Sequence, residues 1–162
     1  MNRLRQGVPG NASWLLVACI GVPLVIGQLV STLVFALDPT AAAGISPADV
    51  GLPAWWFALI FTVIYAGMGV AFWQVLRHRD ALALPAGVLL AAISVGFLQT
   101  LLFWSARGLP AILVADLNAV LAAGAVTALM FRFCRPAAWW LLPWLGWMIL
   151  TTILKIHVIY GA

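Results

Sequence analysis

The chain has 162 residues, of which 65% are hydrophobic and 7% are charged, and its formal net charge at pH 7 is +4. A mean hydropathy of +1.13 excludes a soluble globular protein and predicts an integral membrane protein. The basic residues gather in short connections between apolar runs, so we interpret the positive charge as a signal of membrane topology and expect no nucleic-acid partner.

Five apolar runs are long enough to cross a bilayer as helices of about 20 residues each. They cover residues 14–37, 54–75, 81–104, 110–133 and 139–160. The alternation of apolar and polar residues that a transmembrane barrel requires is absent from the sequence. The sequence therefore predicts an all-α integral membrane protein, a single domain over residues 1–162 that forms a bundle of five transmembrane helices in the lipid bilayer.

The first run follows a basic segment that contains Arg3 and Arg5, as the core of a signal peptide does. The run is too long for such a core, and we expect it to be retained as the first span. Gly21 and Pro23 lie inside this run, and a proline there should kink the helix or loosen its packing.

Basic residues are divided unequally between the two sides of the predicted bundle. The side with the N-terminus and the second and fourth connections has six of them: Arg3, Arg5, Arg77, Arg79, Arg132 and Arg135. The other side has Arg107 and Lys155. The positive-inside rule then places the N-terminus in the cytoplasm and the C-terminus on the outer side.

Aromatic side chains follow helical spacing in the second and fifth runs. In the second run the residues at steps of three or four are Phe57, Phe61, Tyr65, Met68 and Phe72, and in the fifth they are Trp140, Trp144, Trp147, Thr151 and Lys155. Residues at this spacing share one face of a helix. Lipid does not require such a stripe, so we expect both stripes to face neighbouring helices or a ligand.

Polar residues inside the predicted spans gather in the outer half of the bundle. Asp116 lies about 9 Å inside the outer end of the fourth span, at 1.5 Å per residue, and Lys155 and Gln99 lie at similar depth. Intramembrane ionisable residues are usual markers of function. We predict that Asp116 and Lys155 pair. The pair would fix the fourth span against the fifth, or Lys155 would attract a ligand carboxylate, or Lys155 alone would extend to the surface.

Small residues and cysteines give weaker signals. Two pairs at four-residue spacing, Gly87 with Ala91 and Ala92 with Gly96, would allow close helix packing within one bundle or a homodimer through the third span. Cys19 and Cys134 predict neither a disulfide nor, with the two histidines, a metal site. No arrangement of nucleophile and base is visible, and we expect no catalytic residues.

Four motifs in order resemble the TspO/MBR family, the translocator, peripheral benzodiazepine receptor or tryptophan-rich sensory proteins. The first run resembles the family motif through Gly21, Pro23 and Gly27, and the second through Pro53, Trp55, Phe57, Tyr65, Met68 and Ala71. The third resembles it over residues 100–104, and the fifth over residues 135–139 with Pro143, Trp144 and Trp147. Phe61 and Lys155 stand where the family has tryptophan and asparagine.

The resemblance implies a five-helix bundle of a bacterial inner membrane, often dimeric, with a pocket for a porphyrin or other tetrapyrrole under the first loop and a link to pigment synthesis. The tetrapyrrole would be a ligand, and we expect that the protein requires no resident cofactor. The pocket residues would be Trp55, Phe57, Phe61, Tyr65, Gln99, Asp116, Trp144, Trp147 and Lys155. The leading hypothesis is a regulatory or sensory protein that binds a tetrapyrrole or a similarly large apolar pigment. The alternative is a non-enzymatic accessory or assembly subunit of a larger membrane complex, such as a photosynthetic pigment-protein assembly.

Overall fold

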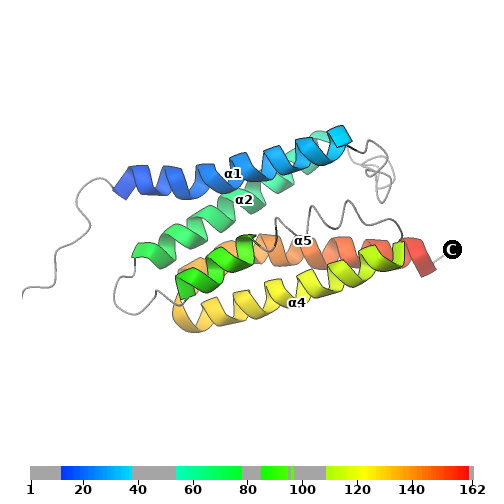
Figure 1. Ribbon diagram of the computed structural model, residues 1–162. Coiled ribbons are helices and arrows are strands. Elements are labelled where there is room, and N and C mark those ends of the chain that lie inside the picture. The colour runs from blue at the N-terminus through cyan, green and yellow to red at the C-terminus, as the bar shows by residue number, and fades with distance from the viewer. Residues whose placement is uncertain (1–11, 38–53, 78–84, 95, 97–108, 161–162) are drawn as a thin grey trace, which may run out of the picture.

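The computed structural model of the chain describes residues 12–37, 54–77, 85–94, 96 and 109–160 (Figure 1). Regular structure in these residues is entirely helical. The four long helices are α1 (Ala12–Leu37), α2 (Ala54–Arg77), α4 (Leu109–Phe133) and α5 (Arg135–Tyr160). A shorter apolar helix covers Pro85–Ser94.

Each of the four long helices contains a stretch long and apolar enough to cross a membrane. The helix Pro85–Ser94 lies within the predicted third span, and most of the remainder of that span falls outside the described residues. An all-helical membrane protein is therefore confirmed. The count of five spans and the orientation of the two termini stay predictions.

The start of α5 is the clearest difference from the predicted boundaries. We expected a helix from Trp139, whereas α5 begins four residues earlier at Arg135. Pro136 lies in the first turn, where a missing N–H removes no helical hydrogen bond. Cys134 alone separates the helices: its N–H donates to the Met130 carbonyl at 2.7 Å, and its own carbonyl accepts from Ala137 and Ala138. The connection between α4 and α5 is thus a single residue.

The long helices form a row in which α1 contacts α2, α2 contacts α5, and α5 contacts α4. Successive helices run in opposite directions, so α2 and α4 end where α1 and α5 begin (Figure 1). We call that end the basic end, because the described arginines Arg77, Arg132 and Arg135 lie there. The hydrophobic core lies mostly between α2 and the first half of α5, and Leu89 and Ile93 of the short helix pack into it.

Two glycines of α2 set its distance from the helices on either side. A Cβ atom at Gly67 would lie 2.7 Å from the Trp140 carbonyl oxygen of α5. A Cβ atom at Gly69 would collide with the Cys19 carbonyl oxygen of α1 and lie 2.6 Å from the Ile20 Cα. These are backbone atoms that cannot rotate away, so the close approach requires glycine.

The contact at Gly69 also explains how α1 accommodates its proline. Pro23 lies four residues after Cys19 and has no N–H, so the Cys19 carbonyl lacks its donor within the helix. The Gly69 hydrogen that takes the place of a side chain points at this oxygen. A Cα–H···O contact of this kind is a recurring feature of closely packed helices.

We expect Gly69→Ala to lower the free energy of unfolding by about 1–3 kcal/mol, because α1 would have to move away from α2. Thermal unfolding in detergent measures the change. Gly124→Ala is the matched control, because a Cβ atom there meets open space. That substitution should be neutral or stabilise the helix by up to about 1 kcal/mol. Equal stability of the two variants would contradict the close approach.

Candidate functional site

The polar part of the candidate site is an ion pair between α4 and α5. Lys155 Nζ lies 2.5 Å from Asp116 Oδ2, and the two side chains are 12% and 5% exposed. The predicted pairing of Asp116 with Lys155 is confirmed. The alternative in which Lys155 extends alone to the membrane surface is wrong, because its ammonium group lies against the Asp116 carboxylate and its side chain is only 12% exposed.

The polar side chains near this pair bond mostly to their own helices. The buried Thr152 hydroxyl donates to the Met148 carbonyl at 2.8 Å, and the half-buried Thr151 hydroxyl lies 3.0 Å from the Trp147 carbonyl. The exposed Asn118 amide donates to the Val114 carbonyl at 2.9 Å. Such bonds satisfy polar groups where lipid offers no partner. The pair is therefore the principal polar link between α4 and α5 in the described part of the chain.

The aromatic part of the candidate site joins α2 to α5. Phe61 and Tyr65 stack at a ring distance of 6.0 Å, and Phe61 meets the Trp147 ring edge-on at 5.9 Å. The Tyr65 ring also occupies the space in which Gly27 of α1 would carry a side chain. Three predicted site residues, Phe61, Tyr65 and Trp147, are thus brought together, and we call them the aromatic group.

A groove of about 320 Å³ runs along the exposed surface of the contact between α2 and α5. We call this exposed surface the outer side of the contact and the buried surface its inner side. Its walls are Trp56, Leu59, Ile60, Val63 and Ile64 of α2, and Pro143, Gly146, Trp147 and Leu150 of α5. These nine described residues are apolar apart from the indole N–H groups of the two tryptophans. The groove is open at Gly146, since a Cβ atom there would meet nothing within 4 Å.

Sequence reasoning missed this groove, although Trp147 belongs to both the prediction and the wall. Trp56 was not among the predicted pocket residues, and it stacks on the predicted Trp55 at a ring distance of 5.0 Å. The small residues Pro143 and Gly146, three positions apart on one helix, were the available signal. Without the neighbouring face of α2 they could not be recognised as one side of a groove.

The predicted site residues are not gathered in one pocket. Leu150 in the groove and Lys155 in the ion pair are five residues apart, which places them about 140° apart around α5. Trp144 is 8% exposed and belongs to the hydrophobic core. Gln99 and the Phe57 side chain lie outside the described residues. The structure therefore separates a buried ion pair from an apolar groove flanked by the aromatic group.

Residues 19–160, nearly the whole chain, match the TspO/MBR family. The chain belongs to this family. No curated protein and no solved structure matches the chain significantly. Two residues of the TspO/MBR motifs have a physical role here, because Gly27 leaves the space that the Tyr65 ring fills.

We expect Asp116→Asn or Lys155→Met alone to lower the free energy of unfolding by about 3–5 kcal/mol, because each leaves the other charge buried without its main partner. The double variant Asp116→Leu/Lys155→Met should lose less than either single variant, since it buries no charge. Unfolding by denaturing detergent in micelles measures all three. Additive losses in the double variant would contradict a direct pair.

Proposed function

We propose that this TspO/MBR protein binds a tetrapyrrole or a similarly large, apolar, pigment-related molecule and acts as a regulatory or sensory protein rather than an enzyme. The observation that carries the proposal is the groove between α2 and α5, which joins an apolar wall to the aromatic group. Tryptophan rings suit stacking on a planar macrocycle, and apolar walls suit its hydrocarbon edge.

The size and position of the groove restrict how such a ligand would bind. Small-molecule pockets commonly have volumes of about 300–1,000 Å³, and the groove, at about 320 Å³, is at the small end of this range. We infer that it accommodates one edge of a macrocycle rather than the whole ring. The groove lies on the outer side of two helices that are apolar enough to span a membrane. We infer that the ligand dissolves in the bilayer first and enters from the side, with its remaining edge in contact with lipid.

The ion pair is assigned a structural role in this proposal. Lys155 already has a carboxylate partner at 2.5 Å, and a ligand carboxylate would have to displace Asp116. The pair also lies about 140° around α5 from the groove, as the spacing of Leu150 and Lys155 indicates. The Lys155→Met variant separates the roles: lost folding supports the structural role, and intact folding with lost binding of an anionic ligand supports the ligand role.

The accessory-subunit alternative has one observation in its favour. Tyr65, Met68 and Trp144 are each less than 9% exposed and fill the space between α2 and α5 on the inner side of the groove. A bundle with a filled interior could serve a larger bacterial membrane complex through its outer faces alone. Co-purification of large partners in mild detergent would support this alternative.

We expect the purified wild-type protein to bind protoporphyrin IX saturably at micromolar concentration, followed by porphyrin absorbance and by quenching of tryptophan fluorescence. Gly146→Leu fills the groove without a clash at Cβ and should weaken binding at least about tenfold, because even one extra methylene in a hydrophobic pocket changes the binding free energy by about 1–3 kcal/mol. Gly124→Leu is the matched control, also into open space, and should bind as the wild type does.

Two results would contradict the proposal in different ways. Wild-type protein without saturable binding would exclude the tetrapyrrole function and favour the accessory subunit. Equal binding by wild type, Gly146→Leu and Gly124→Leu would retain the function and exclude the groove as its site.

A further inference from the structure

The residues on the exposed side of α5 change from charged to aromatic to apolar between the basic end and the groove. Arg135, Trp139, Pro143, Gly146 and Leu150 follow one another at steps of three or four residues, and all five are exposed. This spacing places them along one face of the helix. A basic residue, an aromatic ring and the α5 wall of the groove therefore follow in order along the same face.

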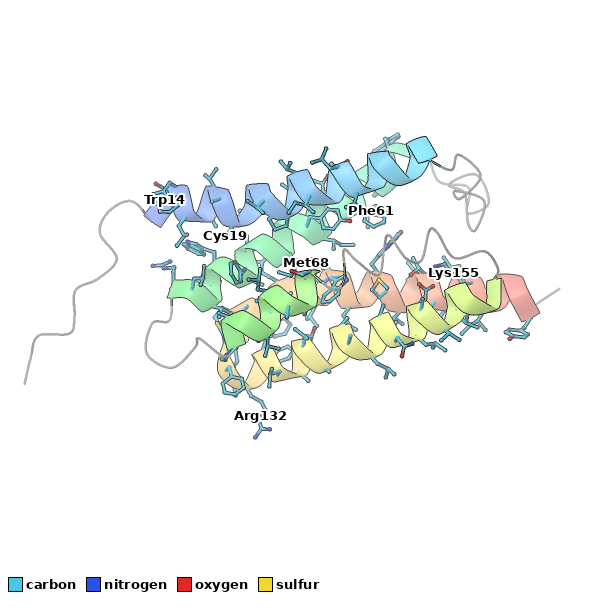
Figure 2. All side chains as sticks on the ribbon, viewed as in Figure 1. Trp14, Cys19, Phe61, Met68, Arg132 and Lys155 are labelled. Carbon is cyan, nitrogen blue, oxygen red and sulfur yellow. The ribbon has the colours of Figure 1, made fainter. Side chains whose placement is uncertain are left out.

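The charged head of this series consists of two arginines. Arg132 and Arg135 flank Cys134 at the connection between α4 and α5, and both are exposed. The labelled Arg132 side chain extends away from the bundle (Figure 2). Asp116, the one acidic residue within the described ranges, lies in the α4–α5 ion pair. The positive charge of Arg132 and Arg135 is thus available to an external anion.

Arg77 lies at the same end of the bundle but is engaged differently. Its guanidinium carbon lies 4.6 Å from the centre of the Trp73 ring, in a cation–π contact within α2. The groove also lies farther from Arg77: the nearest groove residue of α2 is Ile64, about 20 Å along the helix, whereas Pro143 lies about 12 Å from Arg135 on α5. Arg77 therefore provides an internal comparison for the effect of basic charge alone.

Aromatic residues extend the arginine pair towards the apolar region. Trp139 is 64% exposed and is held by an edge contact with Phe131 at a ring distance of 5.7 Å, and Phe133 is 50% exposed. At 1.5 Å per residue, Trp139 lies about 6 Å and Gly146 about 16 Å along α5 from Arg135. Half of a bilayer's hydrocarbon core is about 15 Å thick, so a lipid chain that starts near Arg135 reaches the groove.

We propose that this face binds one anionic phospholipid, with its phosphate at Arg132 and Arg135 and one acyl chain along Trp139 to Pro143 and Gly146. Guanidinium groups hold phosphate through paired, charge-assisted hydrogen bonds, and the indole ring suits the boundary between head groups and chains. A free phosphate would bind the arginines but would make no contact with Trp139, Pro143 and Gly146. The lipid site does not depend on pigment binding by the protein.

The test uses the full chain in nanodiscs and native mass spectrometry. Wild-type protein is expected to retain one long-chain phosphatidylglycerol in preference to phosphatidylcholine. Each arginine near an anionic lipid contributes a factor of about five in affinity, so Arg132→Gln/Arg135→Gln should weaken retention about 25-fold. Arg77→Gln, which removes a basic charge from the same end, should change retention less than twofold.

Three outcomes would overturn the proposal. Wild-type protein could show no preference for the anionic lipid. Arg77→Gln could weaken retention about fivefold, the factor expected of one arginine in the double variant, which would indicate diffuse attraction. Inorganic phosphate or a six-carbon phosphatidylglycerol could displace the long-chain lipid at equal concentration, which would indicate a free-anion site. The wild-type arms decide the question even where the double variant does not insert.

Discussion

Gly67 and Gly69 lie two residues apart on α2, about 200° around the helix, and each meets the backbone of a different neighbour. Because both contacts are with carbonyl oxygens, the distances from α2 to α1 and α5 are set by the absence of side chains. The aromatic group depends on these distances: Tyr65 reaches α1 at Gly27, and Phe61 reaches Trp147 on α5. The groove is the outer side of the same α2–α5 contact.

The fourth long helix joins the row by a different kind of interaction. Asp116 and Lys155 link α4 to α5, and the one-residue connection at Cys134 links them again at the basic end. Because the two opposite charges lie 2.5 Å apart, the pair adds no net charge to the interior of the bundle. An ion pair is specific because any other rotation of α4 would leave both charges in an apolar medium. Glycine contacts thus set the distances of α2 from α1 and α5, whereas the ion pair, the Cys134 connection and the buried Ala123 and Met130 hold α4 against α5.

The length of the apolar runs predicted the long helices, because a membrane span needs about 20 apolar residues and runs of this length are typical of membrane helices. Depth along the spans also predicted the ion pair, since Asp116 and Lys155 lie at similar distances from their helix ends. The start of α5 was predicted four residues late, because Arg135 and Pro136 resemble a connection although a first helical turn tolerates both. The groove was not predictable, because it depends on how α2 and α5 are rotated about their axes. That rotation also separates Trp144 in the core from Trp147 at the groove, although they are three residues apart.

Recognition from the lipid side follows from the contrast between the two sides of α5. Among the described residues, the inner side offers the paired Asp116 and Lys155 and the closely packed Trp144 and Leu141. The outer side has the Trp139 ring and the groove at Pro143 and Gly146, and it begins at Arg135, which with Arg132 of α4 has no acidic partner within the described residues. A molecule that recognises this order is an amphiphile already dissolved in the membrane. The acyl chain and the apolar pigment proposed here would meet at Gly146, so each would exclude the other from the groove. The lipid composition of the membrane would then set how much pigment the protein binds.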